Sequence, residues 1–283
     1  MNSFQVIQPS QLLTPFIKQY WFLTLNDVPQ SSQRIIPFGN VALSFNRGER
    51  SYSSSENGLL PLSYITGQLT SYTNVTYSGN INLISIIFQP ASARLFFNFP
   101  LSELNNKNIP IEALDDPQLT ELEKYLAETY SNEACAKLIE KYLLKRLYEP
   151  ERSGHSRLNA VIHSINHCEN NIFGLAQAAC LGYKQFNRIF NENIGIQPKD
   201  FLRIVRFQKA FHILQVQSQI TLTKLAFECN YYDKSHLIRE FKEFTGYTPR
   251  KLLSLCDPYC DYHSLFRSAF IDSPSIQPNI KNE

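Results

Sequence analysis

The stretch LAFECNYYDKSHLIREF, residues 225–241, decides the fold of the second half of the chain. It repeats an earlier stretch, LAQAACLGYKQFNRIF, residues 175–190. A glycine and then a proline follow each copy, at Gly195 and Pro198 and at Gly246 and Pro249. The leading Leu-Ala pairs are 50 residues apart and the later matches are 51 apart, so the second copy has one extra residue in its turn. This pattern predicts two helix-turn-helix units within residues 151–255.

Each copy has an apolar face and a polar face at helical spacing. Phe186, Ile189 and Phe190 form an i, i+3, i+4 stripe, and Leu237 and Phe241 form its counterpart. The opposite faces carry side chains of the types that reach guanine, adenine and phosphate from the major groove. The candidate DNA-binding residues are Lys184, Gln185, Asn187, Arg188, Lys234, Ser235, His236, Arg239 and Lys242.

The start of each second helix can also be read from the sequence. Gly182 allows a helix to begin without a steric penalty, and Asp233 is suited to accept hydrogen bonds as an N-cap. We therefore expect the two outward-facing helices to begin directly after these residues.

The repeat resembles the DNA-binding domain of AraC/XylS-type regulators. The resemblance is strongest in YYDKSHLIREFKEFTGYTP, residues 231–249, and covers about 100 residues. The family usually has glycine in the turn, where this chain has Cys180 and Asn230. Asparagine tolerates the left-handed conformation more readily than cysteine does.

The resemblance implies how such a domain meets DNA. A long helix, here residues 198–215, joins the two units, and two recognition helices enter successive major grooves about one turn (~34 Å) apart. Base contacts then fall to two groups of matching positions, whereas His236 and Lys242 approach the phosphate backbone. The base-contact candidates are Lys184, Asn187, Arg188, Lys234, Ser235 and Arg239.

Residues 1–115 are predicted to be β-rich. VALSF at 41–45 and NINLISIIF at 80–88 are β-branched or aromatic runs separated by glycine-asparagine turns. Two short helices are expected near residues 10–19 and 90–98. This part is similar to the sensor-like domain ahead of some AraC-type modules. The matching stretches are YW at 20–21, RIIPFG at 34–39, ITGQ at 65–68 and IFQP at 87–90. The resemblance implies a cupin-like barrel and a small-molecule effector.

The pattern becomes helical from Pro117 onward. Leu119, Leu122 and Leu126 form one stripe, and Leu138 and Tyr142 belong to another. These stripes fit either packing within the chain or a weak homodimer interface. The predicted fold is a two-domain α+β chain. Its divisions are a β-rich barrel-like domain at 1–115, a helical linker at 116–150, an all-α double helix-turn-helix domain at 151–255 and an irregular tail at 256–283.

Charge is distributed unevenly along the 283 residues, whose net charge is +2. Residues 151–255 carry 14 Lys and Arg against 8 Asp and Glu, which gives +6, and the remainder carries −4. A basic module beside an acidic one indicates a polyanionic partner for the basic part. We expect promoter or operator DNA as that partner, with RNA polymerase as a further one. No apolar run approaches the length of a membrane span and the N-terminus has no signal pattern, so a cytoplasmic protein is expected.

The β-rich part lacks the histidines and cysteines that a metal-dependent enzyme would need there. All six His lie at 155 or later and no Cys precedes Cys135, so the β-rich part contains no imidazole or thiolate cluster for a metal. His163, His167 and Cys168 have metal-ligand spacing but fit one side of a helix better. Cys256, Cys260 and His263 could clip zinc, yet a fourth ligand is not obvious. No catalytic residue, cofactor or metal is therefore predicted.

Overall fold

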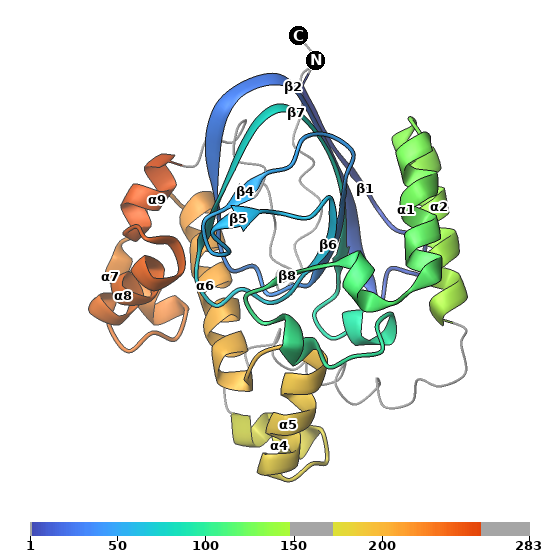
Figure 1. The fold of residues 1–283 in the computed structure, drawn as a ribbon. Coiled ribbons are helices and arrows are strands. Elements are labelled where there is room, and N and C mark those ends of the chain that lie inside the picture. Colours follow the sequence, from blue (N-terminus) through green and yellow to red (C-terminus); the bar gives the residue numbers. More distant parts are fainter. Residues whose placement is uncertain (1, 148–171, 256–283) are drawn as a thin grey trace.

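The computed structural model describes residues 2–147 and 172–255. A β-rich part comes first and a helical part follows, as the sequence predicts (Figure 1). Within these ranges, every helix is too short or too polar to cross a bilayer. The metal-spaced groups around His163 and Cys256 lie outside the described residues, as does the predicted boundary near residue 150.

The strands of the β-rich part form one antiparallel, eight-stranded sheet in the order β1-β2-β7-β3-β6-β8, with β4 pairing β5 and β7. Their bounds are β1 Ser3–Ile7, β2 Ile17–Ile35, β3 Ala42–Asn46, β4 Tyr52–Ser53, β5 Gly58–Leu59, β6 Ser63–Thr66, β7 Thr73–Phe88 and β8 Asn108–Pro110. The long strands β2 and β7 bend strongly and wrap the sheet around an interior (Figure 1). Among the described residues no pairing joins β8 back to β1, so the predicted barrel is a curled, open sheet.

The sheet buries both of its faces along β3 and the last residues of β7, and the two-residue period of a strand decides which side chain lies on which face. On β7, Leu83, Ser85 and Ile87 face the inside of the curl, whereas Ile84 and Ile86 face the opposite side. A shift of one residue in register would exchange the two sets. Because both faces are buried, the sequence of β7 shows only partial alternation.

Two helices, α1 (Pro117–Glu128) and α2 (Asn132–Leu147), cover the outer face of the sheet. Leu119, Leu122, Leu126 and Tyr142 are buried in the same core as the sheet, and Leu138 packs against it. Of the two interpretations of these apolar stripes, packing within the chain is therefore the one that accounts for most of their residues.

Arg47 on the sheet side anchors the end of α1. Its guanidinium donates to the carbonyl of Leu126 at 3.0 Å and also to that of Thr129, while its other nitrogens bond Asn82. A cation at the C-terminal end of a helix is favoured because the last carbonyls have no partner within the helix.

The expected short helices are smaller than predicted. Residues 10–14 make one helical turn, in which Thr14 N donates to the Ser10 carbonyl at 3.0 Å, and β2 then begins at Ile17. The aromatic run after Ile17 pairs with strands on both sides, which overrides the local helical pattern. Near residues 90–98 there is a 3₁₀ turn, η1 (Ala93–Leu95), followed by η2 (Leu101–Leu104) and η3 (Ile111–Leu114).

The described helical part folds around its own core, which is rich in phenylalanine. Its helices are α4 Ile172–Ala178, α5 Tyr183–Ile194, α6 Pro198–Val216, α7 Leu222–Glu228, α8 Lys234–Thr245 and α9 Pro249–Leu255. The long helix α6 confirms the predicted connector at 198–215. It runs between the unit that contains α4 and α5 and the unit that contains α7, α8 and α9 (Figure 1).

Candidate nucleic-acid interface

The first helix-turn-helix unit consists of α4 and α5. Leu175 and Ala176 of α4 are buried, as are Phe186 and Phe190 of α5. The ring of Phe190 meets Phe201 of α6 edge-on, with 5.5 Å between centroids. The apolar stripe predicted from the sequence therefore fixes α5 to the connector.

The second unit, α7 and α8, is built from the corresponding residues. Leu225, Ala226, Leu237 and Phe241 are buried. The ring of Phe241 meets Phe207 of α6 at 4.9 Å between centroids. Both units are thus held on one helix through aromatic pairs at matching positions.

The turns of the two units begin with the same backbone geometry, although neither has glycine at the left-handed position, and the second turn is one residue longer. Cys180 and Asn230 both have left-handed backbones, with φ of 54° and 57°. In each turn the next residue's N–H donates back to the alanine carbonyl of the first helix at 2.9 Å, from Leu181 in one copy and from Tyr231 in the other. Cysteine and asparagine therefore adopt the left-handed conformation that these turns require without glycine.

The left-handed cysteine gives a stability prediction. We expect Cys180→Gly to raise the free energy of unfolding by about 0.5–1 kcal/mol, because glycine removes the steric cost of this conformation but adds chain entropy to the unfolded state. The thiol is exposed, so little packing is lost. Asn230→Gly is the matched control and should change stability less. Urea denaturation measures both, and equal gains in the two variants would contradict the explanation.

The N-terminal caps of the outward-facing helices follow the prediction. Gly182 is the N-cap of α5 and makes no side-chain bond, whereas the Asp233 carboxylate accepts from the His236 N–H at 2.6 Å. The His236 ring is engaged here as well. Its Nδ1 accepts from the Tyr232 N–H at 3.4 Å, and its edge lies against Tyr231.

The polar faces of α5 and α8 are open to solvent. Seven of the nine candidate residues are exposed: Lys184, Gln185, Arg188, Lys234, Ser235, Arg239 and Lys242. Asn187 and His236 are half-buried, and the Asn187 amide donates to the Tyr183 carbonyl at 2.9 Å. Arg188 lies 3.4 Å from Glu192, but the two side chains are 66% and 40% exposed, so this pair opposes a DNA contact only weakly.

A buried charge cluster, not anticipated from the sequence, fixes α8 to α6. The Glu240 side chain is 1% exposed, and its carboxylate accepts from Arg203 Nε at 3.1 Å and from Arg206 Nη2 at 2.6 Å. Burial lowers the pKa of the Arg206 guanidinium, but the hydrogen bonds and the charge of Glu240 more than offset this and raise it. Removing one partner of such a buried cluster would leave an uncompensated charge, so these ion pairs favour one orientation of α8 against α6.

The β-rich part contacts α8 at its C-terminal end. Arg34 of β2 donates through Nη1 to the Thr245 carbonyl at 2.8 Å. Its guanidinium lies between the rings of Tyr72 and Tyr247, 4.2 and 4.4 Å from their centroids. Its Nε donates to Asn74 Oδ1 at 3.0 Å. Arg34 therefore serves as a charged cap for α8, provided by another part of the chain.

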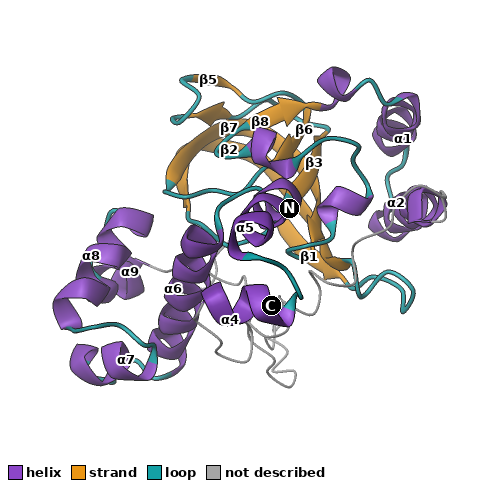
Figure 2. Ribbon diagram, turned by 90° about the horizontal axis from the view of Figure 1, so that it is seen from below, coloured by secondary structure: helices purple, strands orange, loops and turns teal. Residues whose placement is uncertain are grey.

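Other contacts extend this interface along α6 and α5. The buried Gln208 amide of α6 donates to the Pro37 carbonyl, and Ile36 and Ala91 pack against the helical core. The C-cap of α5, Gly195, comes close to the carbonyl of Leu101, and α5 lies beside η1 and η2 (Figure 2). The β-rich part thus contacts α5 and α8 at their C-terminal ends and leaves their polar faces exposed.

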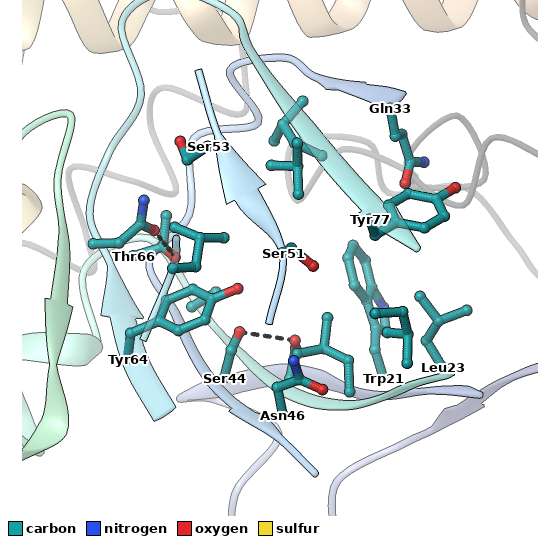
Figure 3. Close-up of a pocket in the computed structure, with 18 of the residues that line it drawn as sticks. Trp21, Leu23, Gln33, Ser44, Asn46, Ser51, Ser53, Tyr64, Thr66 and Tyr77 are labelled. Atoms are coloured by element: carbon teal, nitrogen blue, oxygen red, sulfur yellow. Dashed lines mark hydrogen bonds between the residues drawn. The ribbon is translucent and has the colours of Figure 1, made fainter. Parts of the chain in front are cut away.

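The curl of the sheet encloses a cavity of about 140 Å³ (Figure 3). Side chains of β2, β3, β6 and β7 line it, among them Trp21, Ser44, Tyr64 and Ser85. The family resemblance implies an effector domain, but the sequence pattern assigns none of these residues to a ligand. Among the described residues, no three His, Cys, Asp or Glu side chains are grouped so that they could hold a metal ion.

Two protein families match separate parts of this chain, one in the β-rich part and one in the helical part. Residues 175–254 match a family described as "Helix-turn-helix domain", and residues 5–110 match one described as "Domain of unknown function (DUF6597)". Over 105 residues the chain is 35% identical to an uncharacterized HTH-type transcriptional regulator of Haemophilus influenzae. Over 109 residues it is 27% identical to the HTH-type transcriptional activator RhaS of Escherichia fergusonii.

These two matches cover 35% and 38% of this chain, and the chain spans 35% and 39% of the two relatives. Among solved structures, ToxT from Vibrio cholerae O395 aligns over 89% of this chain and 97% of its own, at 12% identity and a TM-score of 0.44. That similarity is too distant to support an argument about this chain.

Proposed function

We propose that the whole chain is a sequence-specific DNA-binding regulator of transcription of the AraC/XylS type, because residues 175–254 match a helix-turn-helix domain and the similar proteins are named HTH-type transcriptional regulators. The observation that carries the proposal is the pair of exposed, cation-bearing faces on α5 and α8, both fixed to the single connector α6. Exposed lysine and arginine on a recognition helix supply both phosphate attraction and base readout.

We propose that α5 and α8 enter successive major grooves of one DNA site. In this arrangement Arg188 and Arg239 read bases, with Lys184, Asn187, Lys234 and Ser235 beside them, and Gln185 at the edge of the first face. Lys242, in the last turn of α8, approaches a phosphate. His236 remains a candidate for the backbone, although its contacts with Tyr231 and Tyr232 support the start of α8 first.

Footprinting of the purified protein on DNA from its own upstream region tests the proposed function. We expect two protected segments about one helical turn, ~34 Å, apart on one face of the duplex. Random DNA of equal length is the control, and it should compete at least a hundredfold less well. Equal competition by random DNA would indicate an architectural DNA-binding protein and would refute promoter-specific regulation.

We further propose that the β-rich part controls the helical part in response to a small molecule. Its contacts through Arg34, Gln208 and Leu101 link the curled sheet to both units, which supports this role. We also propose that the protein contacts RNA polymerase and that it forms a weak homodimer. A protein acting on promoters in this way works in the cytoplasm of a bacterial cell and needs no catalytic residue. The division into domains at 1–115, 116–150 and 151–255 is proposed with it.

A further inference from the structure

The cavity in the β-rich part has a regular lining set by strand register. Trp21 pairs with Ser85, Ser85 with Ser44, and Ser44 with Tyr64, so these four side chains form one row across β2, β7, β3 and β6. All four line the cavity, and Figure 3 shows Trp21, Ser44 and Tyr64 around it. The tryptophan is the only one in the chain.

The lining contains no charged side chain among the described residues. Apolar side chains dominate, and the polar ones are serines, threonines, amides and tyrosines. An ionised carboxylate or ammonium group inside such a lining would lose its hydration without gaining an opposite charge. The cavity therefore selects against charged molecules.

Neutral hydrogen-bonding groups lie together at one position of the lining. Ser44 Oγ and Ser85 Oγ are 2.9 Å apart, and the Tyr64 hydroxyl lies next to Ser44. Burial raises the pKa of Tyr64 to about 12, a hydrogen bond with Ser44 opposes the rise, and the charge of Glu56 adds to it. The phenol is thus neutral near pH 7 and can both donate and accept.

The cavity volume sets the size of a molecule that fits. About 140 Å³ is close to an apolar cavity of about 150 Å³ that holds benzene. A void of this size deprives its lining of dispersion contacts, which a ring-sized molecule would restore.

We propose that this cavity binds an uncharged, ring-sized molecule that carries one hydroxyl or carbonyl group, with the ring beside Trp21 and the polar group at Ser44, Ser85 and Tyr64. The inference rests on the proposed function, because it names the chemical class of the effector. The cavity lining also extends to the strand residues that flank the interdomain contact. Gln33 and Ile35 line the cavity on either side of Arg34, and Thr73 lines it between Tyr72 and Asn74.

Benzyl alcohol and benzoate are the probes, since they share a ring and differ in charge. Fluorescence of Trp21, excited where tyrosine does not absorb, reports binding in the full-length protein at neutral pH. We expect a saturable change with benzyl alcohol and at least tenfold weaker binding of benzoate. Equal or tighter binding of benzoate would overturn the proposal. Cyclohexanol is a second neutral probe with a ring and a hydroxyl group, and the absence of a response to both alcohols would overturn the proposal as well.

A charge placed at the cavity is the second test. Ser51 lines the cavity and is only half-buried, so Ser51→Arg can be accommodated there, and it should shift the preference toward benzoate by tenfold or more. The matched control is Ser32→Arg on an exposed position of β2, which should keep the original preference. If Ser51→Arg leaves the preference unchanged, the probes bind elsewhere and the assignment is wrong.

Neither readout involves DNA, which separates this inference from the proposed function. Specific DNA binding without a response to neutral probes would overturn the ligand class alone. Binding of benzyl alcohol by a protein that does not distinguish its upstream region from random DNA would refute the regulator and leave the cavity assignment standing.

Discussion

Replacing Arg239 by alanine is expected to relax base preference by about ten- to hundredfold at one half of the DNA site. A bidentate arginine contact with guanine O6 and N7 discriminates by about 1–3 kcal/mol. Arg239 lies on the exposed face of α8, and the buried ion pairs of the neighbouring Glu240 fix the orientation of this helix. A rigid helix with an exposed arginine is the arrangement that base readout needs.

Arg188→Ala should relax preference at the other half of the site by a similar factor. The Arg188 side chain must first leave Glu192, but a pair this exposed contributes at most about 1 kcal/mol. Loss of preference at two separate halves, one for each variant, would also show that both units bind at the same time.

Lys242→Ala is the matched control, because Lys242 is exposed on the same helix, close to its C-terminal end. We expect this variant to bind every operator variant more weakly and to lose the same factor of affinity on each, since a phosphate contact conveys no base information. The slope of log affinity against log salt concentration should become shallower by about one. Operator variants titrated at two salt concentrations make the comparison. If both arginine variants behave like Lys242→Ala, the arginines contact phosphates and our assignment of specificity is wrong. Unchanged affinity in the double arginine variant would reject the docking arrangement itself.

The helical part could be predicted closely because its signals are local. Asp233 and Gly246 mark the two ends of α8 within the sequence, and Pro198 marks the start of α6. The repeated apolar stripes then identify the buried face of each recognition helix. None of these features depends on residues distant in the chain.

The Glu240 cluster could not be predicted in the same way. In the sequence Glu240 stands between the exposed Arg239 and the buried Phe241, where a glutamate usually faces solvent. Only the crossing of α6 and α8 places Arg203 and Arg206 beside it. The two arginines at i, i+3, bordering the apolar stripe of α6, were the one available signal.

The cavity and the interdomain contact depend on strand register, which the sequence leaves open. Both faces of β7 are apolar, so its pattern does not tell which face meets helices and which lines the cavity. Arg34 reaches Thr245 across 211 positions of the chain, and it does so because β2 pairs Arg34 with Asn74 of β7. The sequence predicts a helix near residues 10–19, but only a turn at 10–14 forms. The reason is the same, since the pairing of β2 on both sides is a nonlocal effect.

Arg34→Ala is expected to uncouple the helical part from the β-rich part. The side chain donates a charged hydrogen bond to the Thr245 carbonyl, worth about 1.5–3 kcal/mol. Its two aromatic contacts add about 0.5–1 kcal/mol each where they are partly exposed. Because these contributions are not fully additive, we expect the variant to lose about 2–4 kcal/mol of stability in the helical part. That corresponds to a melting temperature lower by about 10–30 °C for a domain of this size.

Trp21 fluorescence follows unfolding of the β-rich part, and circular dichroism at the helix band follows mainly the helical part. In Arg34→Ala the helical transition should fall below the fluorescence transition. Arg47→Ala is the matched control, because Arg47 also caps a helix end, that of α1, but makes its contacts within the β-rich part. Arg47→Ala should destabilise the β-rich part, and its circular dichroism transition should not fall below its fluorescence transition.

Arg34→Ala should also keep the Trp21 response to benzyl alcohol while the alcohol no longer alters DNA affinity. Coinciding transitions in Arg34→Ala, or an intact effect of the alcohol on DNA binding, would show that Arg34 does not link the two parts.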